Sequence, residues 1–91
     1  MLTIRYERSF KKDYKRIVKR HYPVDLLQEV ITILASGKEL PAKYKDHGLS
    51  GQYAGLRECH ITPDWLLVYR IIDNELILSL TRTGTHSDIF H

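Results

Sequence analysis

The chain has 91 residues and a formal net charge of +3, with 43% hydrophobic and 27% charged residues. This length allows one small core and is too short for two, so we expect a single domain over residues 1–91. The apolar stretches are too short to span a membrane, and the first residues lack the pattern of a secretory signal. Cys59 is the only cysteine, which excludes an intrachain disulfide and a four-thiolate metal site and favours a reducing cytoplasm.

The positive charge is concentrated at one end of the sequence. Residues 1–20 contain eight Lys and Arg against two acids, Glu7 and Asp13, whereas residues 21–91 contain six against nine. A basic segment suits a polyanion or an acidic partner. A solvated helix face has the same composition, so charge alone leaves both interpretations open.

The first part of the chain predicts a strand followed by two helices. Residues 2–6 alternate between apolar and polar types and indicate a strand. Ser9 is suited to cap the helix that follows. The apolar stripe of this helix has helical spacing and consists of Phe10, Tyr14, Ile17, Val18 and His21.

Pro23 interrupts the first helical pattern, and residues 24–36 resume it. The apolar positions of this second helix are Leu27, Val30, Ile31 and Leu34. Gly37 is a natural stop, so the two helices are expected to form a helical hairpin. A polar loop with little periodicity covers residues 37–55, and long loops in small domains are often functional.

Three strands are predicted in the last third of the chain, over residues 56–61, 65–72 and 75–83. The first connection is "TPD", with proline placed for a tight turn, and the second is the two-residue hairpin signal "DN". The order of elements predicts an α+β fold, in which a helical hairpin packs on one face of a mainly antiparallel four-stranded sheet.

Several residues with reactive side chains are expected to meet at one edge of this sheet. His60 and Asp64 flank the first hairpin turn, Arg82 and His86 follow the end of the last strand, and His47 lies in the long loop. Each has a simpler explanation alone, as a solvated histidine or a turn residue. Only their convergence suggests a site.

The side of the sheet that Arg82 occupies is not settled by the pattern. Arg82 has the same parity as Leu76, Leu78 and Leu80, so strict alternation would direct it toward the core. Either the strand kinks before Arg82 or the core stops there.

This combination of side chains fits RNA cleavage by the neighbouring 2′-hydroxyl. Imidazoles exchange protons at cellular pH, and arginine matches the charge and shape of a phosphate. Trp65 and Phe90 could stack a splayed-out base, although Trp65 taken alone is better suited to the core. No metal or cofactor is required. A zinc site built from three His and one Asp is the competing interpretation, but the spacings match no compact ligand motif.

Two segments, which carry three spaced motifs, resemble one known family. "YKDHGLSGQYAGLRECHITPDWLLVYRI" and "RTGTHSDIF" are similar to the YafQ branch of the RelE/ParE superfamily of bacterial toxins. That branch carries the motifs KDH-x-L-x-G, R-[DE]-x-H-x-x-PDW-[IL]-L-[IV]-Y and R-x-G-[ST]-H-x-x-[IL]-F. The match covers residues 44–90, and more loosely the strand and helices before them.

The resemblance implies a toxin with a βααβββ fold that enters the ribosomal A site and cleaves mRNA there. It also implies a cognate antitoxin that inhibits the toxin in a hetero-oligomer and binds the operon's promoter. Carried over by motif, the functional positions are His47, His60, Asp64, Arg82, His86 and Phe90. The histidines and Asp64 would share proton transfer, Arg82 would hold the phosphate and Phe90 would orient the substrate.

The basic N-terminal helix would then contact ribosomal RNA through phosphates. Its candidate residues are Lys11, Lys12, Lys15, Arg16, Lys19 and Arg20. Two alternatives remain. The ParE side of the superfamily has the same small fold but inhibits DNA gyrase without chemistry and lacks the histidine set, and a plain RNA- or ribosome-binding module would also be basic.

Overall fold

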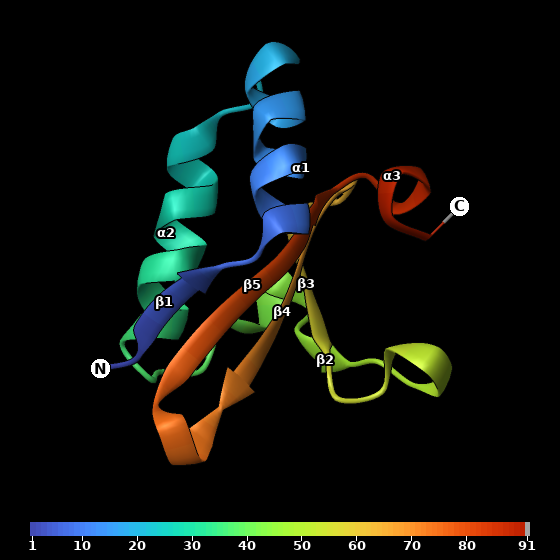
Figure 1. Cartoon of the computed structure of the whole chain (residues 1–91). Helices are drawn as coiled ribbons and strands as arrows, with labels where there is room; N and C mark the ends of the chain where they lie inside the picture. Colours follow the sequence, from blue (N-terminus) through green and yellow to red (C-terminus); the bar gives the residue numbers. More distant parts are fainter. Residues whose placement is uncertain (91) are drawn as a thin grey trace.

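The computed structural model describes residues 1–90, so His91 lies outside the described residues. Figure 1 shows two helices lying against one side of a twisted sheet, with a third short helix at the end of the chain. The elements are β1 (Thr3–Tyr6), α1 (Arg8–Lys19), α2 (Val24–Ala35), η1 (Ala42–Tyr44), β2 (His47–Gly48), η2 (Gly51–Tyr53), β3 (Arg57–Thr62), β4 (Trp65–Ile72), η3 (Asp73–Glu75), β5 (Ile77–Gly84) and α3 (His86–Phe90). The expected α+β class is confirmed.

The sheet has five strands rather than four, in the order β1-β5-β4-β3-β2. β1 runs parallel to β5, and every other pair is antiparallel. The additional strand is β2, which lies in the long loop and pairs only His47 and Gly48 with β3. Two residues are too few to produce an alternating pattern, which is why the sequence predicted a loop there.

The main core lies between the sheet and the two long helices. Ile17 of α1 and Leu27 of α2 pack with Leu67 of β4 and Leu80 of β5, and all four are buried. A smaller apolar cluster occupies the opposite face of the sheet, where Leu66, Val68 and Ile89 are buried. The sheet therefore has one face closed by helices and one face mostly left for other contacts.

Ser9 does not cap α1, contrary to the sequence-based expectation. The helix begins at Arg8, with Glu7 in the cap position, and no side chain caps it. Ser9 instead donates a hydrogen bond to the carbonyl oxygen of Thr81 at 2.6 Å. The reason is that β1 ends at Tyr6, so the edge of β5 beyond it needs other partners.

Two of the predicted connections can be compared with those observed. The "TPD" turn is confirmed, since β3 ends at Thr62 and β4 begins at Trp65. The two-residue hairpin at "DN" is wrong, because η3 and Leu76 form a longer connection in which Leu76 is left-handed (φ 55°). The terminal helix α3 was not expected. None of the helices within residues 1–90 is long and apolar enough to cross a membrane.

Candidate active site

Strand pairing aligns two catalytic candidates across the sheet. His47 of β2 pairs with Glu58 of β3, Glu58 pairs with Val68 of β4, and Val68 pairs with Arg82 of β5. Directly paired residues point to the same face of a sheet. His47, Glu58 and Arg82 therefore share the face of Val68.

His60 belongs to the same face. It pairs with Leu66, which lies beside Val68 in the small apolar cluster. The residues that alternate with these, Cys59 and Leu67, are in the core beneath α1 and α2. The candidate site thus occupies the sheet face opposite the two long helices.

A β-bulge in β5 decides the orientation of Arg82. Tyr69 pairs with Leu80, but the next residue of β4, Val68, pairs with Arg82, so Thr81 is an extra residue. One inserted residue reverses the alternation of everything after it. Leu80 stays on the helix face, whereas Arg82 moves to the open face, which answers the question that parity left open.

Both ring nitrogens of His47 face acceptors. Nδ1 lies 2.8 Å from the carbonyl oxygen of Lys45, and Nε2 lies 3.0 Å from Oε2 of Glu58. A carbonyl only accepts, so Nδ1 carries a proton, and a second proton lies between Nε2 and Oε2. The hydrogen bond between Nε2 and Oε2 therefore ties the His47 ring to Glu58.

Glu58 is unusual for a charged residue because it is only 6% exposed. Its second oxygen, Oε1, is buried without a hydrogen-bond partner among residues 1–90. A buried carboxylate oxygen left in this way is costly. Glu58 is therefore a member of the site, although sequence reasoning did not select it.

His60 is half-buried and lies next to His47, with 6.4 Å between the ring centroids. Its Nδ1 is 3.3 Å from the carbonyl oxygen of Pro63. If Nδ1 donates this long hydrogen bond, Nε2 keeps its lone pair. Asp64 is exposed in the turn that follows Pro63, at the same end of β3 as His60.

The terminal helix α3 carries the last two candidates. His86 is exposed, and its ring centroid is 4.9 Å from that of Phe90. Phe90 also meets the ring of Tyr53 edge-on, at 5.0 Å and 89°. Phe90 packs against the small apolar cluster, so α3 lies at the border of the candidate site.

Arg82 is held by groups from two other elements. Its Nε lies 2.5 Å from Oδ2 of Asp13 in α1, and its Nη2 lies 3.2 Å from Oδ1 of Asp13. Nη2 also donates to the carbonyl oxygen of Asp88 in α3 at 3.2 Å. The hydrogen bond with Asp13 raises the pKa of Arg82 above its ordinary value. Arg82 and the helix of His86 are therefore in direct contact.

A family model described as "Bacterial toxin of type II toxin-antitoxin system, YafQ" matches residues 2–91. The chain belongs to this family. It is 41% identical over 88 residues to the mRNA interferase toxin YafQ of Escherichia coli strain K12, covering 96% of this chain and 94% of that protein.

Solved structures agree with this assignment. A metal-bound toxin from Helicobacter pylori is similar with 47% identity and a TM-score of 0.92, covering 99% of this chain and 100% of that chain. A chain in a crystal structure of the E. coli DinJ–YafQ complex matches with 39% identity and a TM-score of 0.91, covering 100% of this chain and 100% of that chain.

Trp65 cannot serve as a stacking surface for RNA, contrary to the sequence-based hypothesis. It is 2% exposed, its ring meets Tyr22 edge-on at 5.0 Å, and its Nε1 donates to Oγ1 of Thr83 at 2.8 Å. Trp65 starts β4 on the helix face, so its side chain fills the core. Phe90, which is half-buried, remains the aromatic candidate.

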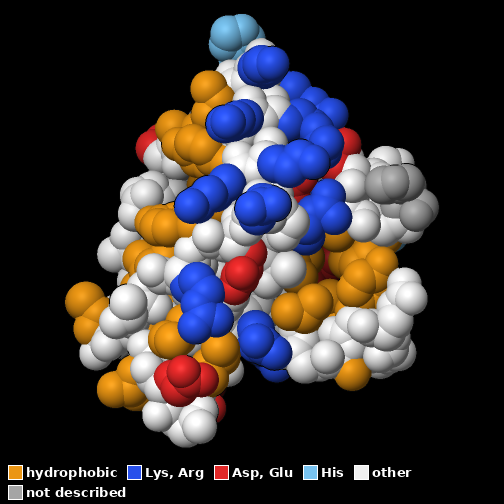
Figure 2. All heavy atoms as spheres, viewed as in Figure 1, with side chains coloured by type: hydrophobic (Ala, Val, Ile, Leu, Met, Phe, Trp, Pro, Cys, Tyr) orange, Lys and Arg blue, Asp and Glu red, His pale blue; other side chains and the backbone are white. Residues whose placement is uncertain are grey.

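The basic residues of α1 fall into two groups. Figure 2 shows Lys and Arg side chains gathered over α1. Arg16 and Arg20 both approach Asp88, at 3.8 and 2.7 Å. The other group consists of the four lysines of α1, which are Lys11, Lys12, Lys15 and Lys19. All four are exposed, and the ion pairs found within residues 1–90 include none of them.

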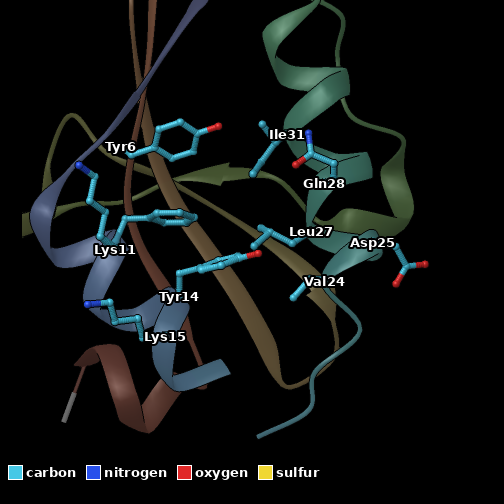
Figure 3. A pocket seen from close by; sticks show the side chains of 10 residues that line it. Tyr6, Lys11, Tyr14, Lys15, Val24, Asp25, Leu27, Gln28 and Ile31 are labelled. Atoms are coloured by element: carbon cyan, nitrogen blue, oxygen red, sulfur yellow. The ribbon is translucent and has the colours of Figure 1, made fainter. Parts of the chain in front are cut away.

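A large apolar groove lies away from the histidines. It has a volume of about 660 Å³ and runs between α1 and α2, and Figure 3 shows Tyr6 and Tyr14 on one side of it and Leu27 and Ile31 on the other. The lining contains no imidazole.

Residues 1–90 contain no group of three His, Cys, Asp or Glu side chains arranged to hold a metal ion.

Sequence reasoning missed two members of the site, Glu58 and Asp13. Glu58 and His60 are two positions apart on β3, so strand parity predicts that both share a face. Asp13 gave no usable signal, because an acidic residue in a basic helix is indistinguishable from a surface residue until the partner strand is known.

Proposed function

We propose that this chain is a ribosome-dependent mRNA endoribonuclease, the toxin of a type II toxin–antitoxin system. The E. coli relative is named an mRNA interferase toxin, and the match extends over nearly all of both proteins. The observation that supports the proposal is the row of side chains on the open face of the sheet, which His47, His60 and Arg82 share. We place the activity in a single domain in the cytoplasm.

The reaction begins with removal of the 2′-hydroxyl proton of the mRNA. His60 is suited to this step, because Nε2 remains an acceptor when Nδ1 donates to Pro63. The 2′-oxygen attacks the phosphorus, the bond to the 5′-oxygen breaks, and an imidazolium donates a proton to that oxygen. His47 and His86 are the candidate proton donors, and Asp64 assists proton transfer from the turn.

Arg82 is suited to stabilise the phosphate in the transition state. Asp13 and the backbone of Asp88 occupy Nε and Nη2, which fixes the guanidinium plane and leaves Nη1 for the substrate. A positioned cation of this kind needs no reorganisation when charge builds on the phosphate. Phe90 then stacks a base beside the scissile bond.

The lysines of α1 would contact ribosomal RNA, because phosphate contacts by exposed lysines supply affinity without sequence preference. A cognate antitoxin is the second partner. The E. coli relative is described in a complex with DinJ, and we propose that this chain forms a comparable inhibitory complex.

The test is to map transcript 5′ ends after brief expression, with ribosomes present and absent. We expect cuts in phase with the reading frame only on translating ribosomes. His60→Ala and His86→Ala should reduce cleavage by about 10²–10⁴-fold. His21→Asn is the matched control: His21 is exposed in the turn after α1 and left-handed (φ 61°), a conformation that Asn tolerates.

Two alternatives give different results in the same experiment. A gyrase inhibitor would damage DNA and leave transcripts intact. An RNA-binding module would bind ribosomes tightly in a salt-sensitive manner and yield no cleaved product in wild type or variants. Unchanged cleavage in both histidine variants would refute the proposal.

A further inference from the structure

The helix α3 is too short to be stable without support from the rest of the molecule. It has five residues, His86–Phe90, and isolated helices of that length do not form in water. Two local devices support it. Thr85 and Asp88 exchange hydrogen bonds between backbone and side chain, at 2.9 and 3.1 Å, which is a capping box. Ile89 is 7% exposed and packs on the sheet.

A third support comes from α1, at the opposite end of the sequence. Arg20 reaches Asp88 with two hydrogen bonds, Nη1 to Oδ2 at 2.7 Å and Nη2 to Oδ1 at 3.2 Å. Bidentate pairs of this kind fix both position and orientation. Arg16 adds a longer contact, at 3.8 Å from Oδ1. Arg20 is the main reason that the pKa of Asp88 lies below its ordinary value.

Asp88 is also where α3 meets Arg82. The backbone carbonyl of Asp88 accepts a hydrogen bond from Nη2 of Arg82. One residue therefore connects the end of α1, the end of β5 and the helix that carries His86 and Phe90. Loss of the Arg20 contact would free α3 on the side facing α1.

We propose that Arg20, assisted by Arg16, is a positioning residue that docks α3 and thereby orients His86, rather than a contact to ribosomal RNA. This inference rests on the proposed function, because His86 is taken as a proton donor. The basic face of α1 and the residue that ends it then have two separate roles, since the lysines bind phosphate whereas Arg16 and Arg20 hold the catalytic helix.

Single-turnover cleavage at saturating ribosome–mRNA complex distinguishes the two roles that Arg20 could have. Arg20→Gln and Asp88→Asn should each lower the rate by about three- to tenfold. The double variant should be no slower than the slower single variant, because both changes remove the same contact. Arg8→Gln is the control: it makes the same substitution at an exposed position at the start of α1, and it should cleave like wild type.

A phosphate contact would behave differently. Arg20→Gln would then keep the wild-type rate at saturation, lose affinity and flatten the salt dependence of binding. That result would overturn the proposal. Additive losses in the double variant would overturn it as well.

A measurement without RNA tests the docking itself. The amide of Ile89 donates to the carbonyl oxygen of Thr85 at 3.2 Å, so its hydrogen exchange reports the opening of α3. We expect exchange about three- to tenfold faster in Arg20→Gln and Asp88→Asn, with no change in Arg8→Gln or in the amides of β4. Unchanged exchange of Ile89 would refute the docking role. This readout stands even if the wild-type protein cleaves no RNA, which would refute only the proposed function.

Discussion

Asp13 and Arg82 form an ion pair that joins the first helix to the last strand. Oδ2 of Asp13 accepts hydrogen bonds from Nε of Arg82 at 2.5 Å and from the backbone amide of Thr83 at 3.1 Å. Asp13 is only 2% exposed. One buried carboxylate therefore satisfies the open edge of β5 and orients the arginine that the proposed mechanism places on the phosphate.

Asp13→Asn should separate these two roles of the carboxylate. The amide oxygen can still accept from Thr83, but it cannot hold a guanidinium with a charge-assisted pair. We expect a loss of about 1–3 kcal/mol in the free energy of unfolding and a fall in kcat of about 10–100-fold, measured by urea titration and single-turnover cleavage. Glu39→Gln, an exposed acid-to-amide change, is the control. A kcat equal to wild type would show that Arg82 needs no anchor.

Gly84 is required for the close approach of Asp88. Its φ is +148°, and an added Cβ would lie 2.9 Å from Oδ2 and 3.0 Å from Cβ of Asp88. Gly84→Ala should therefore cost about 1–3 kcal/mol in unfolding free energy and reduce cleavage, because it displaces α3. Gly55→Ala provides the comparison, since Gly55 also has positive φ (+94°) but no atom within 4 Å of the added Cβ. Equal cleavage by the two variants would contradict this account.

The contribution of Asp88 to stability should be constant around neutral pH. The hydrogen bond from Arg20 holds the pKa of Asp88 below its ordinary value. A carboxyl with a depressed pKa stabilises the folded state above its unfolded pKa of about 3.9 and loses that effect as pH falls through the folded value. The difference in unfolding free energy between wild type and Asp88→Asn should thus be flat from about pH 5 to 8 and shrink below about pH 4. Denaturant titrations over this range test it, and a step near about pH 6.5 would instead implicate a histidine.

Cys59 should be unreactive in the folded protein. It is fully buried, and burial raises the pKa of its thiol to about 12. Because only the thiolate reacts, iodoacetamide at about pH 8 should label the native protein very slowly and the urea-unfolded protein readily. Mass spectrometry over time measures both rates. Rapid labelling of the native chain would mean that the β3 region opens easily.

The elements with strong periodicity were predicted correctly from the sequence. β4 was predicted over residues 65–72 and is observed as Trp65–Ile72, and the two long helices lie within a few residues of their predicted ranges. β2 and α3 were missed, because elements of two and five residues are too short to carry a period.

The candidate site was likewise predicted in part and missed in part. The types and order of His47, His60, Asp64, Arg82 and His86 were sufficient to suggest a metal-free RNA-cleaving site, and its catalytic roles stay predictions. The pattern could not place Arg82, because a bulge at Thr81 reverses the alternation of β5. It also led to a wrong prediction for Trp65, because an aromatic residue at a strand end looks the same whether it faces RNA or the core.

The sequence by itself determined the fold class, the family and the chemical types of the reactive side chains, since these depend on local periodicity and on motifs within short segments. The tertiary structure decided which side chains meet. Asp13 with Arg82 and Arg20 with Asp88 are separated by 69 and 68 residues, and the ion pairs form only when α1 packs across the end of β5. No local pattern encodes such a contact, because its energy exists only once both partners have been brought together by the burial of the core.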